Sequence, residues 1–444
     1  MPGPRSSSVL LGTSLFFAAA LAPTLAQQQQ QLSELDRERA QQMLKTVGDE
    51  VRKHYFDPRY KGVDLNAELD AARQRIAKVN SMNMALSNIA AALDPLDDSH
   101  TFFVPPQHAA RYETGWLYQM VGNHCFITQV RPQSDAAAKG LKAGDELLSI
   151  NGIAPDRDNS WKLQYLFGVL RPQPGFHLVL QDSTGKQRVI DAATRVRETK
   201  RLQDLTGAGG GDFWNLIREE ENRYRQLRIR YTDYGDDLII VKLPEFEMTP
   251  SQIGDLMDKI RKHKALVLDL RGNPGGSVET LSYLAGDFFD KEIKIADRVG
   301  KKDNRPQMTK GPHTAFTGKV VILLDSESAS ASEVLARFMQ IEKRAVIMGD
   351  HSSGKVMEAR EYTEKLGTDS VIFYGVSVTE ADVIMTDGKS LEHVGVAPDE
   401  IVLPTAADLA AGRDPVLAHA AETLGVNISP EVAGKLFPYE WPIQ

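Results

Sequence analysis

The sequence predicts an α/β protein whose core is a largely parallel sheet covered by helices. Three observations support this class. Uninterrupted apolar runs at residues 238–241 and 265–268 are typical of strands buried on both faces. Residues 249–264, between these runs, have helical periodicity. Further strands at 320–324 and 345–348 are separated by a predicted helix in the same way, and such alternation favours a parallel sheet.

The composition is that of an ordinary folded protein. The chain has 444 residues, of which 42% are hydrophobic and 25% are charged, which excludes a disordered, collagenous or multi-span membrane protein. The net charge of −8 gives no basic surface for nucleic acid. A single cysteine, Cys125, excludes an intrachain disulfide, a cysteine-based metal cluster and a CxxC redox site.

The first 26 residues have the layout of a secretory signal peptide. A basic start at residues 1–5 precedes an apolar stretch at 9–22 and a small-residue exit at 23–26. An uncleaved membrane anchor is the alternative, but the apolar run is short for a span and Pro23 interrupts its end. We therefore expect cleavage, export to the periplasm or the extracellular space, and no stable membrane insertion afterwards.

Five further segments follow residues 1–26. Residues 27–110 begin with a glutamine tract and continue with the apolar spacing of a small helical module. Residues 111–197 alternate short apolar runs with Gly, Pro and Asn turns, which predicts a β-rich domain. The charged segment 198–235 is predicted to be a linker or a lid. Residues 236–425 then form the α/β core, and residues 426–444 a C-terminal tail.

Part of the β-rich segment resembles a PDZ domain. In that family a short helix precedes a Gly-Leu-x-x-Gly-Asp turn, a strand and an Asn-Gly turn, and residues 136–152 have this order. PDZ domains bind an extended peptide end as an added strand beside a sheet edge. The resemblance implies that the substrate is bound at Thr114, Gly115, Trp116 and Leu117. A generic β-domain that acts as a spacer is the alternative.

Two strand-to-helix junctions of the core contain residues suited to chemistry, because ligands of α/β sheets bind where strands end. The first junction, residues 269–277, contains Gly275 and Gly276, which allow the backbone to approach a ligand closely. Such a loop can bind phosphate or form half of an oxyanion hole, although the ending of a phosphate-binding P-loop is missing. A tight turn without chemistry is the alternative.

Ser330 lies at the second junction, where a buried strand passes into a helix. Ser330 and Glu333 fit a capping box, which is the purely structural interpretation. A serine at a helix N-terminus is also well placed for nucleophilic attack, but its hydroxyl then needs a base. We favour Lys355, because its loop follows the next buried strand and should emerge at the same sheet edge. A lysine acts as a base only if burial lowers its pKa.

These junctions resemble the carboxy-terminal processing (tail-specific) serine peptidases. The interval of 25 residues from Ser330 to Lys355 is the family's spacing, and the order of helical segment, PDZ domain and protease core is also the family's. The resemblance implies a crotonase/ClpP-like protease core with an inserted PDZ domain. The matching segments are 96–101, 269–276, 328–333, 344–345, 349, 354–355 and 395–399.

The resemblance also implies a role for individual residues. Ser330 matches the nucleophile, Lys355 the general base, and Glu333 an acidic residue with a supporting role. The glycine pair of the first junction matches the oxyanion hole, and the amide of Ala331 is the expected second donor. The chain departs from the family pattern at Ala359, where the family often has a Gln that orients the lysine.

The implied function is an exported serine endopeptidase that cleaves polypeptides near exposed C-terminal tails through a Ser–Lys dyad and an acyl-enzyme. We expect this enzyme to use no metal and no organic cofactor and not to bind nucleic acid. An oligomeric state is compatible with the sequence. One alternative is a catalytically degenerate PDZ scaffold that only binds peptides, suggested by the missing Gln. A second is a hydrolase of small esters with His351, paired with Asp325 or Asp350, or His100 as the base.

Overall fold

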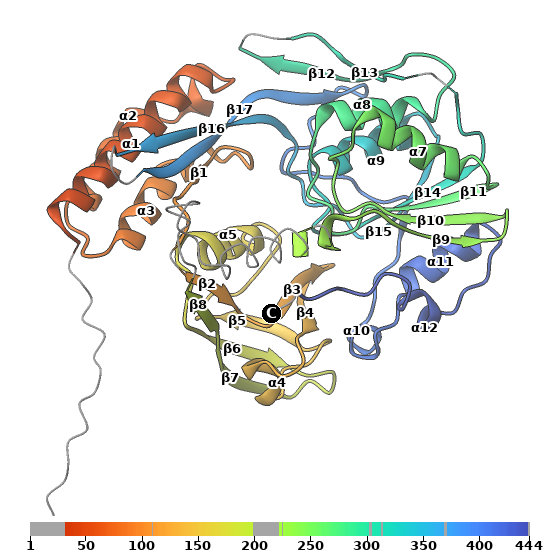
Figure 1. Ribbon diagram of the computed structural model, residues 1–444, viewed down its shortest axis with the longest axis horizontal. Helices are drawn as coiled ribbons and strands as arrows, with labels where there is room; N and C mark the ends of the chain where they lie inside the picture. Colours follow the sequence, from red (N-terminus) through yellow and green to blue (C-terminus); the bar gives the residue numbers. More distant parts are fainter. Residues whose placement is uncertain are drawn as a thin grey trace, which may run out of the picture.

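The computed structural model describes residues 32–108, 110–198, 222–223, 225–301, 304–311, 314–367 and 371–442. They form a helical module, an inserted sheet domain and an α/β core, which follow one another in the colours of Figure 1. The predicted signal peptide and most of the predicted linker lie outside the described residues. Within the described ranges, no helix combines the length and the apolar character that crossing a membrane requires.

Three helices form the module at the start of the chain: α1 (Glu34–His54), α2 (Leu65–Ile76) and α3 (Met82–Ala91). Asp64 caps α2, because its carboxylate accepts hydrogen bonds from the first two free N–H groups of the helix. The apolar faces of the three helices pack into one buried cluster.

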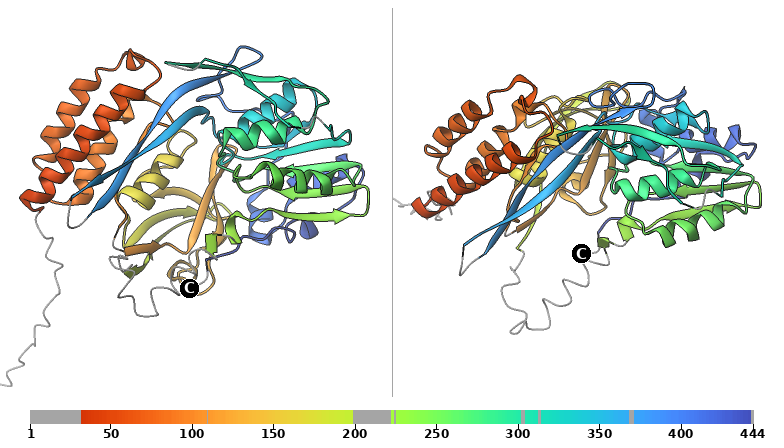
Figure 2. Two further views of the ribbon diagram at one scale, coloured as in Figure 1. Left: turned by 45° about the horizontal axis from the view of Figure 1, so that its top comes forward. Right: turned by 90° about the horizontal axis from the view of Figure 1, so that it is seen from above.

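A long hairpin ties this module to the core. Its strands β16 (Met357–Leu366) and β17 (Ile372–Met385) extend from the core to α1, as Figures 1 and 2 show. β1 (Phe102–Val104) pairs with β17, and Val376 and Val378 of β17 join the buried cluster of the module. Nearer its C-terminal end β17 pairs with β12 (Lys294–Gly300), which pairs in turn with β13 (Gln307–Met308).

The inserted domain is an antiparallel sheet whose first strand lies at an edge. Its order is β3 (Trp116–Val121), β4 (His124–Val130), β5 (Glu146–Ile150), β6 (Gly175–Gln181) and β7 (Gln187–Ala193). The two chain segments that enter and leave this domain pair with each other as β2 (Ala110–Glu113) and β8 (Arg195–Glu198). Two short helices belong to the domain, α4 (Asp135–Ala138) and α5 (Ser160–Tyr165).

The core is a six-stranded sheet covered on both faces, as the apolar runs predicted. Its order is β18 (Glu400–Ile401), β15 (Val346–Gly349), β14 (Lys319–Leu324), β11 (Ala265–Asp269), β10 (Leu238–Lys242) and β9 (Arg230–Tyr234). Every pair except β9–β10 is parallel. The helices on one face are α7 (Pro250–Ile260), α8 (Val278–Gly286) and α9 (Ala331–Ile341). On the other face lie α11 (Pro415–Thr423) and α12 (Pro430–Ala433), and α10 (Ala406–Ala411) precedes them.

The core differs from the predicted boundaries at both ends. β9 lies inside the predicted linker but belongs to the core sheet. It was missed because it is a polar edge strand without an apolar run. The predicted tail at 426–444 is partly core, because Ile428 and Ala433 are buried against β10, β11 and β14.

The central strand β14 provides a test of this core. Ile322 is 0% exposed, so Ile322→Ala removes apolar burial and leaves a cavity, and should lower the free energy of unfolding by about 2–5 kcal/mol. Val299→Ala on β12, where the side chain is 51% exposed, is the control and should change it by no more than about 0.5 kcal/mol. Denaturant titration measures both. Equal losses in the two variants would contradict the packing described.

Candidate active site

The candidate site lies where three neighbouring parallel strands end. β11, β14 and β15 lie side by side in register, so the loops that follow them emerge at one edge of the sheet. The loop after β11 carries the glycine pair, the loop after β14 leads to Ser330, and the loop after β15 carries Lys355. The sequence-based expectation that these loops meet is therefore confirmed.

Ser330 occupies a strained turn at the start of α9. Its φ of 55° and ψ of −119° lie in a region that non-glycine residues rarely adopt. Such strain costs about 1–3 kcal/mol and persists only where the surroundings enforce it. Here the Ser330 N–H donates to the Lys355 carbonyl at 2.9 Å and to the Glu333 carboxylate at 3.1 Å. The backbones of the two predicted site loops are thus joined directly.

The buried carboxylate of Glu333 binds both loops at once. Besides the Ser330 N–H, it accepts the Ser352 hydroxyl at 2.5 Å, the Gly354 N–H at 2.8 Å and the Lys355 N–H at 3.0 Å. Burial raises the pKa of Glu333 to about 7, and the four hydrogen bonds oppose this rise. Glu333 therefore positions the turn of Ser330 relative to the loop of Lys355.

The Lys355 ammonium lies against the inserted domain. Its Nζ is 5.0 Å from the centroid of the Trp161 ring on α5, a cation–π contact. Burial lowers the pKa of Lys355 to about 8, although three nearby carboxylates favour its charged form. Among the described residues, no hydrogen bond joins Nζ to the Ser330 hydroxyl. The structure therefore brings the two residues together through their backbones and not through their side chains.

The glycine loop lies directly against the serine. A Cβ atom on Gly275 would be 2.6 Å from the Cβ of Ser330, so only glycine fits there. The Gly275 N–H is engaged, because it donates to the Asn273 side chain at 2.8 Å. Within the described chain, the N–H groups of Gly276 and Ala331 have no hydrogen-bond partner. These two amides, rather than that of Gly275, are available to stabilise an oxyanion.

The geometry does not support His351 as the base, nor Glu358 as a replacement for the missing Gln. Glu358, next to Ala359, binds Arg298 at 2.5 Å, so its carboxylate does not replace the missing Gln. His351 is exposed, and the carboxylate of Asp350 beside it is bound by Arg157 at 2.6 Å.

A second polar cluster, which the sequence did not reveal as a unit, adjoins the lysine loop. Ser99 donates its hydroxyl to Glu392 at 2.8 Å and lies 2.7 Å from Nδ1 of His100. Glu392 also accepts the N–H of Val356, the neighbour of Lys355, at 2.8 Å. Because the Ser99 proton goes to Glu392, Nδ1 of His100 must supply the proton of its bond to Ser99, which leaves Nε2 unprotonated. Burial lowers the pKa of His100 and keeps the ring neutral.

The four predicted peptide-binding residues lie at the start of β3, in the inserted domain. Thr114 and Gly115 form a turn in which the Thr114 hydroxyl donates to the Trp116 carbonyl at 3.0 Å and Gly115 has a φ of +75°. Leu117 follows this turn on β3. The Trp116 ring is buried in the core of the domain, so it contributes packing and not ligand contact. Thr114 and Leu117 are partly exposed, so a ligand at this turn can meet these two residues rather than the Trp116 ring.

The other end of β3 touches the loop that leads to Ser330. The Gln119 side chain donates to Asp325 at 2.6 Å, and Ser326 donates its hydroxyl to the Met120 carbonyl at 2.6 Å. The edge strand of the inserted domain thus leads from the predicted peptide-binding turn to the nucleophile loop.

Removal of the Glu333 carboxylate tests its structural role. Glu333→Ala leaves buried donors of Ser352, Gly354 and Lys355 without their acceptor, and should cost at least about 3 kcal/mol of unfolding free energy. Glu342→Ala, at the exposed end of the same helix, should change it by no more than about 0.5 kcal/mol. Denaturant titration of both variants is the measurement. Similar values for the two would show that Glu333 does not hold the loops.

Comparisons with known proteins agree with this architecture. Residues 237–402 match the model of peptidase family S41, and residues 111–159 match the PDZ domain. The chain is 23% identical over 367 residues to a chloroplastic carboxyl-terminal-processing peptidase 3 of Arabidopsis thaliana, covering 79% of this chain and 66% of the relative. It is 29% identical over 325 residues to the carboxy-terminal processing protease CtpA of Bacillus subtilis, covering 70% and 62%. The chain thus spans less than two thirds of the length of either relative.

Solved structures share the fold. Mature CPAF in complex with lactacystin superimposes with a TM-score of 0.61 at 15% identity, covering 84% of this chain and 95% of that one. The photosystem II D1 C-terminal processing protease gives a TM-score of 0.50 at 18% identity, covering 88% and 99%. The predicted fold class, a protease core with a helical module and an inserted PDZ domain, is thereby confirmed. Residues 237–402 of this chain thus match peptidase family S41 and residues 111–159 match the PDZ domain, and the chain as a whole is similar to the carboxyl-terminal processing peptidases.

Proposed function

We propose that this protein is an exported serine endopeptidase that uses Ser330 as its nucleophile and cleaves polypeptides near their C-terminal tails. The observation that carries the proposal is the enforced turn of Ser330 beside the free amides of Gly276 and Ala331. A serine at a helix N-terminus next to two unengaged N–H donors has the environment that acyl transfer requires. Export rests on residues 1–26 alone and gives a periplasmic or extracellular location.

The chemistry follows from these groups. The Ser330 oxygen attacks the carbonyl carbon of the substrate while a base accepts its proton, and the two free amides bind the oxyanion. The protonated base then donates to the leaving amine, and water hydrolyses the ester. In the Ser–Lys form the base is Lys355, whose Nζ must leave Trp161, lose its proton and approach Ser330.

The edge strand β3 offers a route for the substrate. A peptide that adds antiparallel to β3, with its C-terminal end at residues 114–117, runs back toward Met120. The Met120 carbonyl already contacts Ser326 in the loop before Ser330. Upstream residues of a bound tail are therefore led to the nucleophile, which supports polypeptides with exposed C-terminal tails as the substrate class.

His100 is a second candidate for the base. Its Nδ1 is held by the Ser99 hydroxyl, which is itself bound to Glu392, so its Nε2 is a neutral acceptor at neutral pH. Lys355, with a pKa of about 8, is mostly protonated there. The non-catalytic alternative is a scaffold that only binds peptides. It is supported by the finding that the Ser330 and Lys355 side chains are not hydrogen-bonded to each other.

Replacement of the nucleophile is the first test. Ser330→Ala should abolish cleavage of an unfolded protein, and mass spectrometry of the digest should show the wild-type cuts missing. Ser183→Ala, in the exposed turn between β6 and β7, is the matched control and should keep them all. Cuts that persist in Ser330→Ala would refute the assignment.

The pH profile identifies the base. If Lys355 is the base, its neutral form must be present, so kcat/KM should rise up to a pH of about 8 and then level off. Lys355→Ala should then lose at least about 100-fold in kcat, and His100→Ala much less. If His100 is the base, kcat/KM is already level at pH 7, because the pKa of His100 is lowered. In that case His100→Ala shows the large loss in kcat and Lys355→Ala the small one. The second result would contradict the Ser–Lys dyad.

A further inference from the structure

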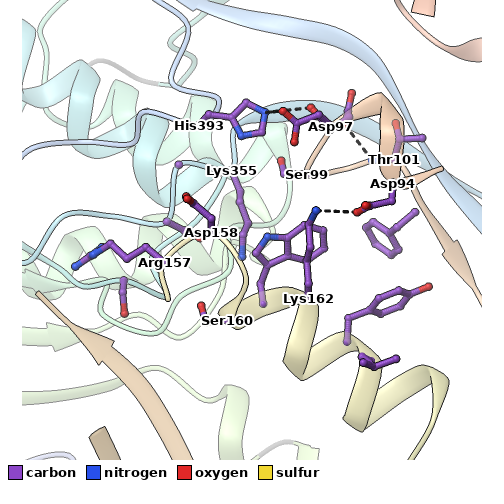
Figure 3. Close-up of a pocket in the computed structure, with 18 of the residues that line it drawn as sticks. Asp94, Asp97, Ser99, Thr101, Arg157, Asp158, Ser160, Lys162, Lys355 and His393 are labelled. Atoms are coloured by element: carbon purple, nitrogen blue, oxygen red, sulfur yellow. Dashed lines mark hydrogen bonds and ion pairs between the residues drawn. The ribbon is translucent and has the colours of Figure 1, made fainter. Parts of the chain in front are cut away.

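A cavity of about 930 Å³ opens beside Lys355, between all three parts of the molecule. Its walls come from the end of α3 with the turn η2 (Asp94–Leu96), from α5 with η3 (Leu166–Leu170), and from the lysine loop. Figure 3 shows Lys355 reaching toward the helix that bears Lys162, with Asp94 on the far side. This volume suffices for a short peptide segment.

The inner wall of the cavity is apolar and fixed. The rings of Phe102 and Tyr165 meet edge to face at 6.0 Å, and the Tyr165 hydroxyl donates to the Phe103 carbonyl. Leu166 and Leu170 continue this wall and pack into the buried cluster of the helical module. A ligand therefore meets a preformed apolar surface rather than one that must be assembled.

Two charged side chains at the rim form an ion pair with each other. Lys162 binds Asp94 at 2.7 Å, as Figure 3 shows, and both side chains are well exposed. Nε2 of His393 lies 3.6 Å from the Asp97 carboxylate. Lys162 compensates the charge of Asp94, and Arg157 is paired with Asp350, but the carboxylates of Asp97 and Asp158 also line the rim, so the rim disfavours an anionic ligand.

We propose that this cavity binds a large apolar side chain of the substrate, next to the bond that is cut, and that the helical module selects it. The inference rests on the proposed function, because it places the substrate beside Lys355. It follows from the apolar inner wall, the acidic rim, which disfavours anionic side chains, and the position of the cavity at the lysine. Aromatic and long aliphatic residues should be preferred there, and Asp, Glu, Lys and Arg disfavoured.

The test fills the cavity from the module side. Ala91, the exposed last residue of α3, lines the cavity, so Ala91→Trp should obstruct it. Ala67→Trp, on the exposed face of α2 away from the cavity, is the matched control. The substrates are peptides built around a bond that the wild type cuts, with Phe, Ala or Asp placed in turn at each position beside it.

The expected result is a preference and its selective loss. At one position the wild type should cleave the Phe peptide at least about tenfold better in kcat/KM than the Asp peptide. Ala91→Trp should lower cleavage of the Phe peptide about tenfold and that of the Ala peptide less than about twofold. Ala67→Trp should behave as the wild type. No preference for Phe at any position, or equal losses for Phe and Ala peptides in Ala91→Trp, would overturn the proposal.

A binding measurement separates this inference from the catalytic one. In the Ser330→Ala background, peptide affinity measured by calorimetry depends on the cavity and not on turnover. The Phe peptide should bind at least about tenfold more tightly than the Asp peptide, and Ala91→Trp should remove this difference. If the Phe peptide binds more tightly in this way while the wild-type cuts persist in Ser330→Ala, the assignment of Ser330 as nucleophile fails and the cavity assignment stands. Equal affinities would refute the cavity assignment itself.

Discussion

The buried carboxylate of Glu333 is the constraint on which the site depends. It accepts hydrogen bonds from the turn of Ser330 and from the loop of Lys355, so two segments 25 residues apart become one unit. A carboxylate this deep in the protein is tolerated only because four donors satisfy it. The same bonds hold Ser330 in a backbone conformation that a serine would otherwise leave. Glu333 is therefore the cause both of the backbone conformation of Ser330 and of the connection between the Ser330 and Lys355 loops.

The inserted domain is part of the site rather than a remote attachment. Gln119 and Arg157 of this domain bind carboxylates in the nucleophile loop and in the lysine loop. Trp161 of the same domain covers the Lys355 ammonium. The helical module completes the surroundings, because its buried cluster includes residues of η3. The Lys355 side chain consequently borders a cavity that all three parts of the chain line.

The sequence predicted the features that depend on local pattern. Parallel strands and the residues at their ends follow from apolar runs and spacing, which is why Ser330 and Lys355 were found together. Glu392 was missed because its link to Ser99 joins residues 293 positions apart. Contacts of this kind depend on tertiary packing, and so does that of Trp161 with Lys355. The engaged amide of Gly275 was likewise not predictable, since the orientation of a peptide group is set by its neighbours.

The claim that Ser330 is an activated nucleophile can be tested without a known substrate. A fluorophosphonate probe reacts with serine hydroxyls that a neighbouring base activates, and mass spectrometry of the digested protein locates the adduct. The account predicts a single adduct on Ser330, formed more slowly when the true base is replaced and absent from Ser330→Ala. No adduct on the folded wild-type protein, or an adduct on Ser99 instead, would contradict it and favour a peptide-binding scaffold or a different nucleophile.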